Sequence, residues 1–180
     1  MRRLMLLRHA KTETDTPSGH DQDRRLDDRG RRDAAEIGIW IGRHPPFPDR
    51  VLVSPAVRAH QTWEIAHAAM QGLAPQPQVE FLPELYGADA THLLRTVRMA
   101  SVTDPKRLML VGHNPGMHEL ALALTGSGDA AAKKALDDNL PTSGLAVFDF
   151  ATDDWNDAAF RRGKLVQFVS PKLLKKISGD

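Results

Sequence analysis

Short runs of apolar residues alternate along the chain with longer segments in which apolar positions recur at helical spacing. The apolar runs predict strands at 3–8, 50–54, 78–82, 107–112, 144–150 and 164–169. The longer segments predict helices at 28–43, 56–71, 89–101, 116–125 and 129–138. This alternation is typical of βαβ units, and the last two strands, which flank a polar loop, indicate a hairpin. We therefore expect an α/β fold: a three-layer α/β/α sandwich with a mostly parallel central sheet and one antiparallel edge strand.

Charged and imidazole side chains stand at the ends of three of these predicted strands. Arg8 ends the first strand and His9 follows it, while His113 directly follows the fourth strand. Arg58 falls in the first turn of the helix that comes after the second strand. The carboxyl ends of parallel strands meet at one edge of a sheet, and ligands bind at that edge in open α/β folds. We therefore expect these side chains to form one polar site.

The two helices that begin at this edge carry recognisable start signals. Ser54 is a candidate N-cap with Pro55 at the first helical position, and Asn114 with Pro115 repeats the arrangement. The free N–H groups and partial positive charge at a helix N-terminus favour an anion. The edge of the sheet is therefore suited to a phosphoryl group.

Each of the side chains at this edge has a chemical role that fits phosphoryl transfer. An imidazole nitrogen can attack phosphorus, so His9 is the candidate nucleophile, provided that it is neutral and that an acceptor such as a backbone carbonyl holds its other nitrogen. Arg8 and Arg58 can each hold two phosphate oxygens, and His113 as an imidazolium can stabilise the transition state. Positioning and electrostatics dominate this chemistry, so no metal is required. Each residue alone has an ordinary structural explanation, but their joint placement favours catalysis.

Composition narrows the class of protein. The chain has 180 residues, 41% hydrophobic and 26% charged, which we interpret as a single globular domain spanning 1–180. A net charge of +1 gives no general attraction to nucleic acid, and the absence of cysteine excludes disulfides, cysteine-bound zinc and thiol catalysis. The apolar run after Arg3 is too short for a secretory signal, and no run is long enough to span a membrane. A cytoplasmic location is therefore expected.

Several short segments carry a family resemblance. Arg8-His9-Ala10, Ser54-Pro55-Ala56-Val57-Arg58-Ala59 with Gln61-Thr62, and Gly112-His113-Asn114-Pro115 resemble the signatures of the histidine phosphatase (phosphoglycerate mutase-like) superfamily. Its SixA-like phosphohistidine phosphatase branch is resembled by Leu6-Leu7-Arg8-His9-Ala10-Lys11, Asp23-Arg24-Arg25-Leu26 with Arg29-Gly30, and Pro141-Thr142-Ser143-Gly144. The resemblance spans about residues 3–150. It implies a phosphoglycerate mutase-like fold, phosphorylation of His9 during turnover, and a phosphate pocket of Arg8, Arg58 and His113, to which we add Asn114.

The general acid is indicated less directly. Superfamily members commonly carry a glutamate just after the third strand, and the resemblance assigns this place to Glu84. Glu84 would protonate the leaving group and then activate water, whereas a surface or helix-capping carboxylate is the alternative. Asp15 and Asp23, in the loop after the first strand, are secondary candidates. A phosphohistidine substrate would need less help, because its imidazole leaves more easily than an alkoxide.

Three further residues are candidates for peripheral substrate binding. Lys11 would attract an anionic substrate, with a solvated loop lysine as the alternative. Arg25 adds a charge near the mouth of the site, at a position where members of the SixA-like branch often have proline, and His20 lies in the loop expected over the site. The remaining histidines show no metal-ligand spacing, so neither a metal nor a cofactor is expected.

The sequence therefore predicts a metal-independent phosphatase that works through a phosphohistidine intermediate. The core elements fill nearly the whole chain and leave little material for a cap, so an open site that accepts protein phosphohistidine is the leading hypothesis. A phosphatase of small phosphomonoesters, such as sugar or nucleotide phosphates, is the alternative, and a non-catalytic phosphate-binding module is a more distant one. The expected partner is a phosphorylated protein or a small phosphorylated metabolite, with no nucleic acid and no membrane. The sequence does not indicate the oligomeric state.

Overall fold

The computed structural model describes residues 1–70, 72 and 75–179, and its strands form one mixed sheet in the order β3-β2-β4-β1-β6-β7-β5. The strands are β1 (Arg2–Arg8), β2 (Arg50–Val53), β3 (Gln78–Phe81), β4 (Arg107–Gly112), β5 (Thr125–Gly128), β6 (Leu145–Phe150) and β7 (Gly163–Val169). The six predicted strands are confirmed to within one residue at each end. The short strand β5 was not predicted.

Helices connect most of these strands. They are α1 (Asp28–Arg43), α2 (Val57–Ala69), α3 (Ala90–Met99), α4 (Gly116–Leu124), α5 (Ala130–Asp138) and α6 (Pro171–Ser178), with short 3-10 helices η1 (Asp21–Asp23), η2 (Pro83–Leu85), η3 (Ala100–Val102) and η4 (Trp155–Asp157). The five predicted helices are confirmed, and α6 is additional. The predicted end of the second helix, residue 71, lies outside the described residues.

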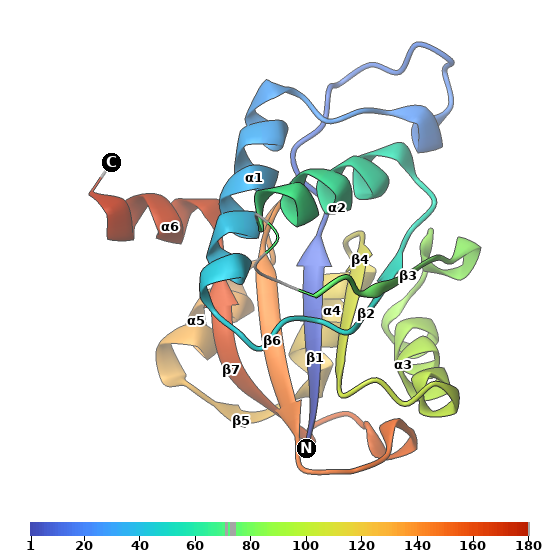
Figure 1. Cartoon of the computed structure of the whole chain (residues 1–180), viewed down its shortest axis with the longest axis vertical. Coiled ribbons are helices and arrows are strands. Elements are labelled where there is room, and N and C mark those ends of the chain that lie inside the picture. The colour runs from blue at the N-terminus through green and yellow to red at the C-terminus, as the bar shows by residue number, and fades with distance from the viewer. Residues whose placement is uncertain (71, 73–74, 180) are drawn as a thin grey trace.

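The helices cover the two faces of the sheet, and each face has its own hydrophobic core. Ile37 of α1 and Trp63 of α2 pack with Leu7 on one face, where Leu174 of α6 also contacts the core. On the other face, α3, α4 and α5 supply apolar side chains to a second core. Figure 1 shows α1 and α2 in front of the sheet and α4 and α5 behind it. The predicted three-layer α/β/α sandwich is confirmed.

Strand register brings the ends of β1, β4 and β2 together. Arg8 at the end of β1 pairs with Gly112 at the end of β4, and Val53 at the end of β2 pairs with Val111. All three strands are parallel, so the residues that follow them leave the sheet at the same edge. The backbone N–H of His9 donates to the Gly112 carbonyl at 3.0 Å, which fixes the start of the loop after β1.

The position of the antiparallel strand differs from the prediction. The hairpin of β6 and β7 is present, but β6 is the antiparallel strand and lies inside the sheet, between β1 and β7. The predicted edge location was wrong because β7, and then β5, extend the sheet beyond β6. The edge strands are β3 and β5 among the residues that the structure describes.

The unpredicted strand β5 depends on glycine. A Cβ atom at Gly126 would lie 1.9 Å from the Arg161 carbonyl oxygen, and one at Gly128 would lie 2.3 Å from the Leu165 carbonyl oxygen. Such a close approach of two backbones is possible only without a side chain, and glycine is also depleted in ordinary strands. The same residues that allow β5 therefore conceal it from a prediction based on strand propensity.

The starts of α2 and α4 also differ from the prediction. Ala56 is the N-cap residue of α2, and Pro115 holds that position in α4, in place of Ser54 and Asn114. Ser54 is instead fully buried, and its hydroxyl points toward the site described below. No helix in the described part of the chain is long and apolar enough to cross a membrane.

Candidate active site

His9 lies just beyond the end of β1 with its ring almost enclosed. The residue is 7% exposed, and burial lowers its pKa to about 3, so the imidazole is neutral at physiological pH. Its Nδ1 lies 2.8 Å from the carbonyl oxygen of Ala10, which can only accept a hydrogen bond. Nδ1 therefore carries the proton, and Nε2 has the free lone pair that a nucleophile requires.

Thr62 of α2 fixes the backbone beside this candidate nucleophile. The Thr62 hydroxyl accepts a hydrogen bond from the Ala10 N–H at 2.9 Å and donates one to the Arg58 carbonyl at 2.7 Å. Thr62 is fully buried, so both bonds are shielded from water. This side chain ties the loop that holds the His9 acceptor to the helix that carries Arg58.

His113 lies opposite His9, immediately after β4. The two ring centroids are 5.1 Å apart, and His113 Nε2 is 2.7 Å from the Ser54 hydroxyl oxygen. That oxygen also accepts from the Ala56 N–H at 3.3 Å, and we assign its own proton to the hydrogen bond with His113 Nε2. The proton of a neutral His113 is then on Nδ1, a buried atom with no partner within the described structure.

The charge state of His113 departs from the sequence-based expectation. Burial, followed by the nearby positive charge of Arg58, lowers its pKa to about 4. The free site therefore holds a neutral imidazole and not the imidazolium that the sequence alone favoured. His113 can still donate a hydrogen bond to a phosphate oxygen from Nδ1, and a bound phosphate dianion would pull its pKa upward.

The two arginines occupy different depths. Arg58 is 5% exposed, and both of its terminal nitrogens are used: one donates to the Asp21 carbonyl at 2.8 Å and the other to Asp21 Oδ2 at 2.9 Å. Arg8 is half-buried and donates to the Leu140 carbonyl at 3.2 Å, and burial lowers its pKa. In both side chains the Nε–H is left as a donor that faces no acceptor.

Four buried side-chain atoms in the described residues lack a hydrogen-bond partner: Arg8 Nε, Arg58 Nε, His113 Nδ1 and Ser143 Oγ. Buried polar atoms are almost always paired in folded proteins, so each unpaired one needs a reason. All four belong to residues at one edge of the sheet, and every one can donate a hydrogen bond. A tetrahedral oxyanion with several acceptor oxygens is the ligand that such a set of donors fits.

Ser143 is held in an unusual backbone conformation. Its φ of 58° lies in the left-handed region, which non-glycine residues rarely adopt, and its side chain is fully buried. The Ser143 N–H donates to the carbonyls of Arg8 and His9 at 3.1 and 3.2 Å. Strained residues of this kind gather at functional sites, where the surrounding structure enforces them. Ser143 thus braces the backbone under the nucleophile.

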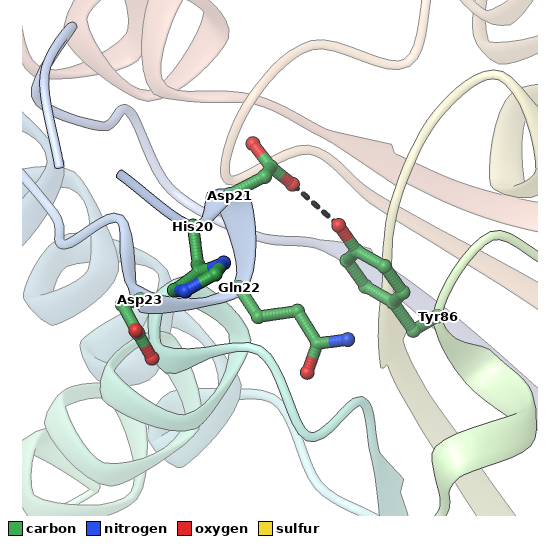
Figure 2. A pocket seen from close by; sticks show the side chains of 5 residues that line it. All are labelled: His20, Asp21, Gln22, Asp23 and Tyr86. Atoms are coloured by element: carbon green, nitrogen blue, oxygen red, sulfur yellow. Dashed lines mark hydrogen bonds between the residues drawn. The ribbon is translucent and has the colours of Figure 1, made fainter. Parts of the chain in front are cut away.

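Asp21 and Tyr86 form the rim of the site through their contacts with Arg58 and His113, and Figure 2 shows their side chains pointing toward each other. The Tyr86 hydroxyl donates to Asp21 Oδ2 at 2.7 Å, and Arg24 approaches Asp21 Oδ1 at 3.1 Å. The hydrogen bond from Tyr86, together with those from Arg58 and Arg24, holds the pKa of Asp21 well below its usual range. His20, Gln22 and Asp23 complete a hollow of about 420 Å³ beside this ionised carboxylate.

Glu84 is not brought to the nucleophile by any hydrogen bond or ion pair in the described structure. It lies on η2 with its side chain exposed, whereas Tyr86, two residues further on, reaches the site through Asp21. The catalytic role of Glu84 therefore stays a prediction. The secondary candidate Asp23 lines the hollow beside Asp21 and accepts a hydrogen bond from the Ser18 hydroxyl at 2.6 Å.

Asn114 uses both ends of its amide within the protein. The side-chain N–H donates to the Leu140 carbonyl at 2.8 Å, and the side-chain oxygen accepts from the His118 N–H at 3.1 Å. The same Leu140 carbonyl accepts from Arg8. Asn114 therefore positions the loop that holds Arg8, and these contacts favour that role over direct phosphate binding.

The peripheral candidates lie at three different places. Lys11 donates to Asp27 Oδ2 at 2.5 Å, so its charge is neutralised at the start of α1. Arg25 is exposed and approaches Glu13 at 3.4 Å. Only His20, at the start of η1, lines the hollow beside Asp21.

Sequence reasoning did not identify Asp21, Tyr86 or the hydroxyl of Ser54 as parts of the site. Ser54 was interpreted as a helix cap, which is the usual role of a serine before a helical proline. Asp21 stands in a loop without periodicity, and a single carboxylate there carries no signal. The chain has one tyrosine, Tyr86, and its place just after Glu84 was the available hint. No group of three or more histidine and acidic residues in the described ranges is placed to hold a metal ion.

Comparisons with known proteins identify the family to which the chain is similar. Residues 4–89 match the model of the histidine phosphatase superfamily, branch 1. An uncharacterized protein of Mycobacterium leprae is 34% identical over 174 residues, covering 92% of this chain and 100% of that protein. A structure described as a candidate phosphohistidine phosphatase SixA of Agrobacterium tumefaciens is 32% identical, covers 94% of this chain and 98% of that one, and superposes with a TM-score of 0.77.

A second SixA candidate, from Nakamurella multipartitia, has a TM-score of 0.79 at 27% identity and covers 94% of this chain and 96% of its own. The predicted resemblance to the SixA-like branch and the predicted enzyme class are therefore confirmed. The chain belongs to the histidine phosphatase superfamily, in its SixA-like branch, and is a phosphatase.

Proposed function

We propose that this phosphatase hydrolyses protein phosphohistidine without a metal, through a phosphohistidine intermediate on His9, within one domain spanning 1–180. The observation that carries the proposal is the state of His9: neutral, nearly enclosed and fixed by the Ala10 carbonyl so that Nε2 holds the free lone pair. The unpaired donors around it supply what a phosphoryl group needs.

In the first step, His9 Nε2 attacks phosphorus while the bond between phosphorus and the substrate imidazole breaks. The electron pair of that bond goes to the leaving nitrogen, and the phosphoryl group becomes bonded to Nε2. The proton on His9 Nδ1 stays there, held by the Ala10 carbonyl at 2.8 Å. Arg8, Arg58 and His113 hold the phosphoryl oxygens and stabilise the charge that develops on them.

In the second step, a water molecule attacks the phosphorus of the intermediate, and the bond from phosphorus to Nε2 breaks. The electron pair returns to Nε2, and both water protons leave with the phosphate. His9 is then again neutral with its proton on Nδ1. The low pKa of His9 favours this return, because the free imidazole is the stable form in the pocket.

The negative charge of Asp21 on the rim favours phosphohistidine over a phosphate ester as the substrate. An alkoxide leaving group needs a general acid, but Asp21 is ionised and Glu84 is exposed without a contact to the pocket. A phosphohistidine that is protonated on its second ring nitrogen departs as neutral imidazole and needs no such acid. The SixA candidates, which are more than 25% identical to this chain, support the same substrate class.

The test compares substrates and variants in one assay. Phosphate release is measured from a histidine-phosphorylated protein and from small phosphate esters, with wild type and His9→Ala side by side and EDTA present throughout. Release from phosphohistidine that disappears in His9→Ala and is indifferent to EDTA is the expected result. Release from small esters alone would keep the His9 mechanism and move the function to phosphomonoester metabolites. Release from neither would reject a phosphatase and leave a phosphate-binding module.

A further inference from the structure

The start of α6 lies near the phosphate pocket, on the side away from Asp21 and Tyr86. Val169 at the end of β7 pairs with Leu145 of β6, which in turn pairs with Leu7 of β1. Neighbouring strands are about 4.8 Å apart, so the end of β7 is roughly 10 Å from the end of β1 along the edge of the sheet. Ser170 caps the helix that begins there, accepting from the Leu173 N–H at 3.2 Å. An element at this distance can contact a substrate that extends beyond the pocket.

A cleft of about 380 Å³ separates α6 from the loop that leads to Ser143, and we call it the α6 cleft. Its lining comprises Arg29, Ala135, Asp138, Asn139, Pro141, Thr142, Phe168, Ser170, Pro171, Lys172, Leu173 and Lys176. The Leu140 carbonyl, which accepts from Arg8 and Asn114, belongs to the same loop. One loop therefore lines the α6 cleft and also contacts Arg8 at the phosphate pocket.

The α6 cleft carries an excess of positive charge. Arg29, Lys172 and Lys176 line it against one acid, Asp138, and because Arg29 is paired with Asp33 at 3.5 Å the lysines carry the excess. Lys175 lies in an adjoining hollow on the same helix. The lysines of α6 make no ion pair with another described residue, whereas most cations near the pocket are paired. Because the whole chain has a net charge of only +1, this excess is local.

We propose that the α6 cleft docks an acidic surface of the phosphoprotein substrate while its phosphorylated side chain occupies the phosphate pocket. This inference rests on the proposed function. Lysine side chains concentrate an anionic partner and orient it during encounter, and the apolar walls of Phe168 and Leu173 add contact area. A small phosphorylated metabolite would not reach the cleft. A flat membrane fits poorly, because Leu174 of the short helix α6 is already packed against the core.

The test uses peptides of defined charge. Two phosphohistidine peptides of about 12 residues are compared, one with aspartates and glutamates on both sides of the phosphorylated residue and one with serines and glycines. The protein variant is Lys172→Glu with Lys176→Glu. Its matched control is Lys133→Glu with Lys134→Glu, which makes the same charge change at exposed positions of α5 outside the cleft. Phosphoramidate, which is too small to reach the cleft, reports on the chemistry alone.

The expected result is a preference of wild type for the acidic peptide of about ten-fold in kcat/KM at low salt, fading at high salt. The Lys172→Glu and Lys176→Glu pair removes the preference, the α5 control pair keeps it, and both turn over phosphoramidate like wild type. If the two double variants lost the preference for the acidic peptide equally, a general charge effect and not the α6 cleft would explain it, and the proposal would be overturned. A wild type without preference that still cleaves both peptides would overturn docking and leave the proposed function standing.

Two other outcomes distinguish the docking surface from the proposed phosphohistidine phosphatase function and from a role of α6 in membrane binding. Hydrolysis of phosphate esters but of no phosphohistidine peptide would overturn the proposed function and the docking surface together. Vesicles of phosphatidylserine are tested for binding by co-sedimentation. Binding to vesicles that depends on the two lysines, with peptide kinetics unchanged in the variant, would assign α6 to a membrane surface and overturn the protein-docking proposal.

Discussion

His9 and Arg58 are buried at the carboxyl edge of the sheet, whereas Asp21, on the short 3-10 helix η1, and Tyr86, just after η2, approach them from the surface. The first pair is fixed by backbone: β1 and α2 set the positions, and Thr62 joins the two segments. The second pair is held by hydrogen bonds that side chains donate to Asp21: Tyr86 and Arg58 donate to its carboxylate, and so does Arg24. We call His9 and Arg58 the floor of the pocket and Asp21 and Tyr86 its rim. The floor is therefore positioned by regular secondary structure, and the rim by hydrogen bonds between side chains.

Because the floor and the rim are positioned differently, we expect substitutions in them to reduce activity to different extents. In the proposed mechanism, a change on the floor removes the nucleophile or a group that holds the phosphoryl oxygens, and it affects the chemical step for every substrate. A change on the rim leaves the nucleophile in place and alters how Arg58 is held, or what lies beside the leaving group. The expected effects therefore fall steeply from floor to rim.

His9→Ala gives the largest effect. Removing the nucleophile abolishes the covalent route, and we expect kcat to fall by at least about 10³-fold for all substrates. Acid-quench analysis after incubation with a labelled phosphohistidine substrate detects the phosphoenzyme in wild type and not in the variant. His92→Ala, at an exposed position of α3, is the matched control. Residual phosphoenzyme in His9→Ala would place the nucleophile elsewhere.

Arg58→Ala is the next largest. The loss of a buried donor to the phosphoryl group costs about 10²–10³-fold in kcat/KM, as for other groups that stabilise transition-state charge. Arg58→Lys restores little, because an ammonium cannot bond Asp21 through two nitrogens and also present a third donor. Steady-state kinetics with phosphoramidate measures both. Full rescue by lysine would show that only the charge of Arg58 matters.

Asp21→Asn tests whether the contacts of Asp21 keep Arg58 in position. Asp21 holds both terminal nitrogens of Arg58, so we expect kcat/KM to fall by roughly ten-fold as this charge-assisted contact weakens. Asp23→Asn removes the same charge from the same hollow without touching Arg58 and serves as control. Tighter binding of tungstate and faster turnover in Asp21→Asn would reverse the interpretation: the carboxylate would then compete with phosphate for Arg58.

Tyr86→Phe sharpens the same comparison with a smaller change. The variant keeps the ring, which lies 5.5 Å from the ring of His113, and removes only the hydroxyl that donates to Asp21. A neutral donor of this kind contributes about 1 kcal/mol, so a loss of two- to ten-fold in kcat/KM is expected. The loss should vanish in an Asp21→Asn background, which a double-mutant cycle measures. A loss that persists there would mean that Tyr86 contacts the substrate directly.

The floor and the rim also differ in how far sequence alone could find them. His9, Arg58 and His113 follow strands whose apolar runs are unmistakable, and parallel strands must end at one edge, so their meeting was predictable. Asp21 and Tyr86 meet because two irregular loops fold toward each other, and no periodicity encodes that contact. α6 was hidden in the same way, because its eight residues include three lysines and resemble a basic tail. Ser54 shows a further limit: its helix-capping signal was plain, but tertiary packing against His113 took its hydroxyl.

The smallest expected effect is an absence of titration. The pKa of His9 lowered to about 3 and that of His113 lowered to about 4 mean that both rings stay neutral from pH 8 to pH 5. Proton NMR follows the Cε1–H signals of these two rings, with the His9 signal assigned by comparison with His9→Ala. Neither signal should show a titration midpoint near the unfolded value of about 6.5. Because the unfolded chain binds these protons first, stability from the two rings is complete above about pH 6.5 and is lost as pH falls toward 4 and then 3. A midpoint near 6.5 for His113 would restore the imidazolium that the sequence favoured, and catalysis would then gain a positive charge at the cost of a stronger pH dependence.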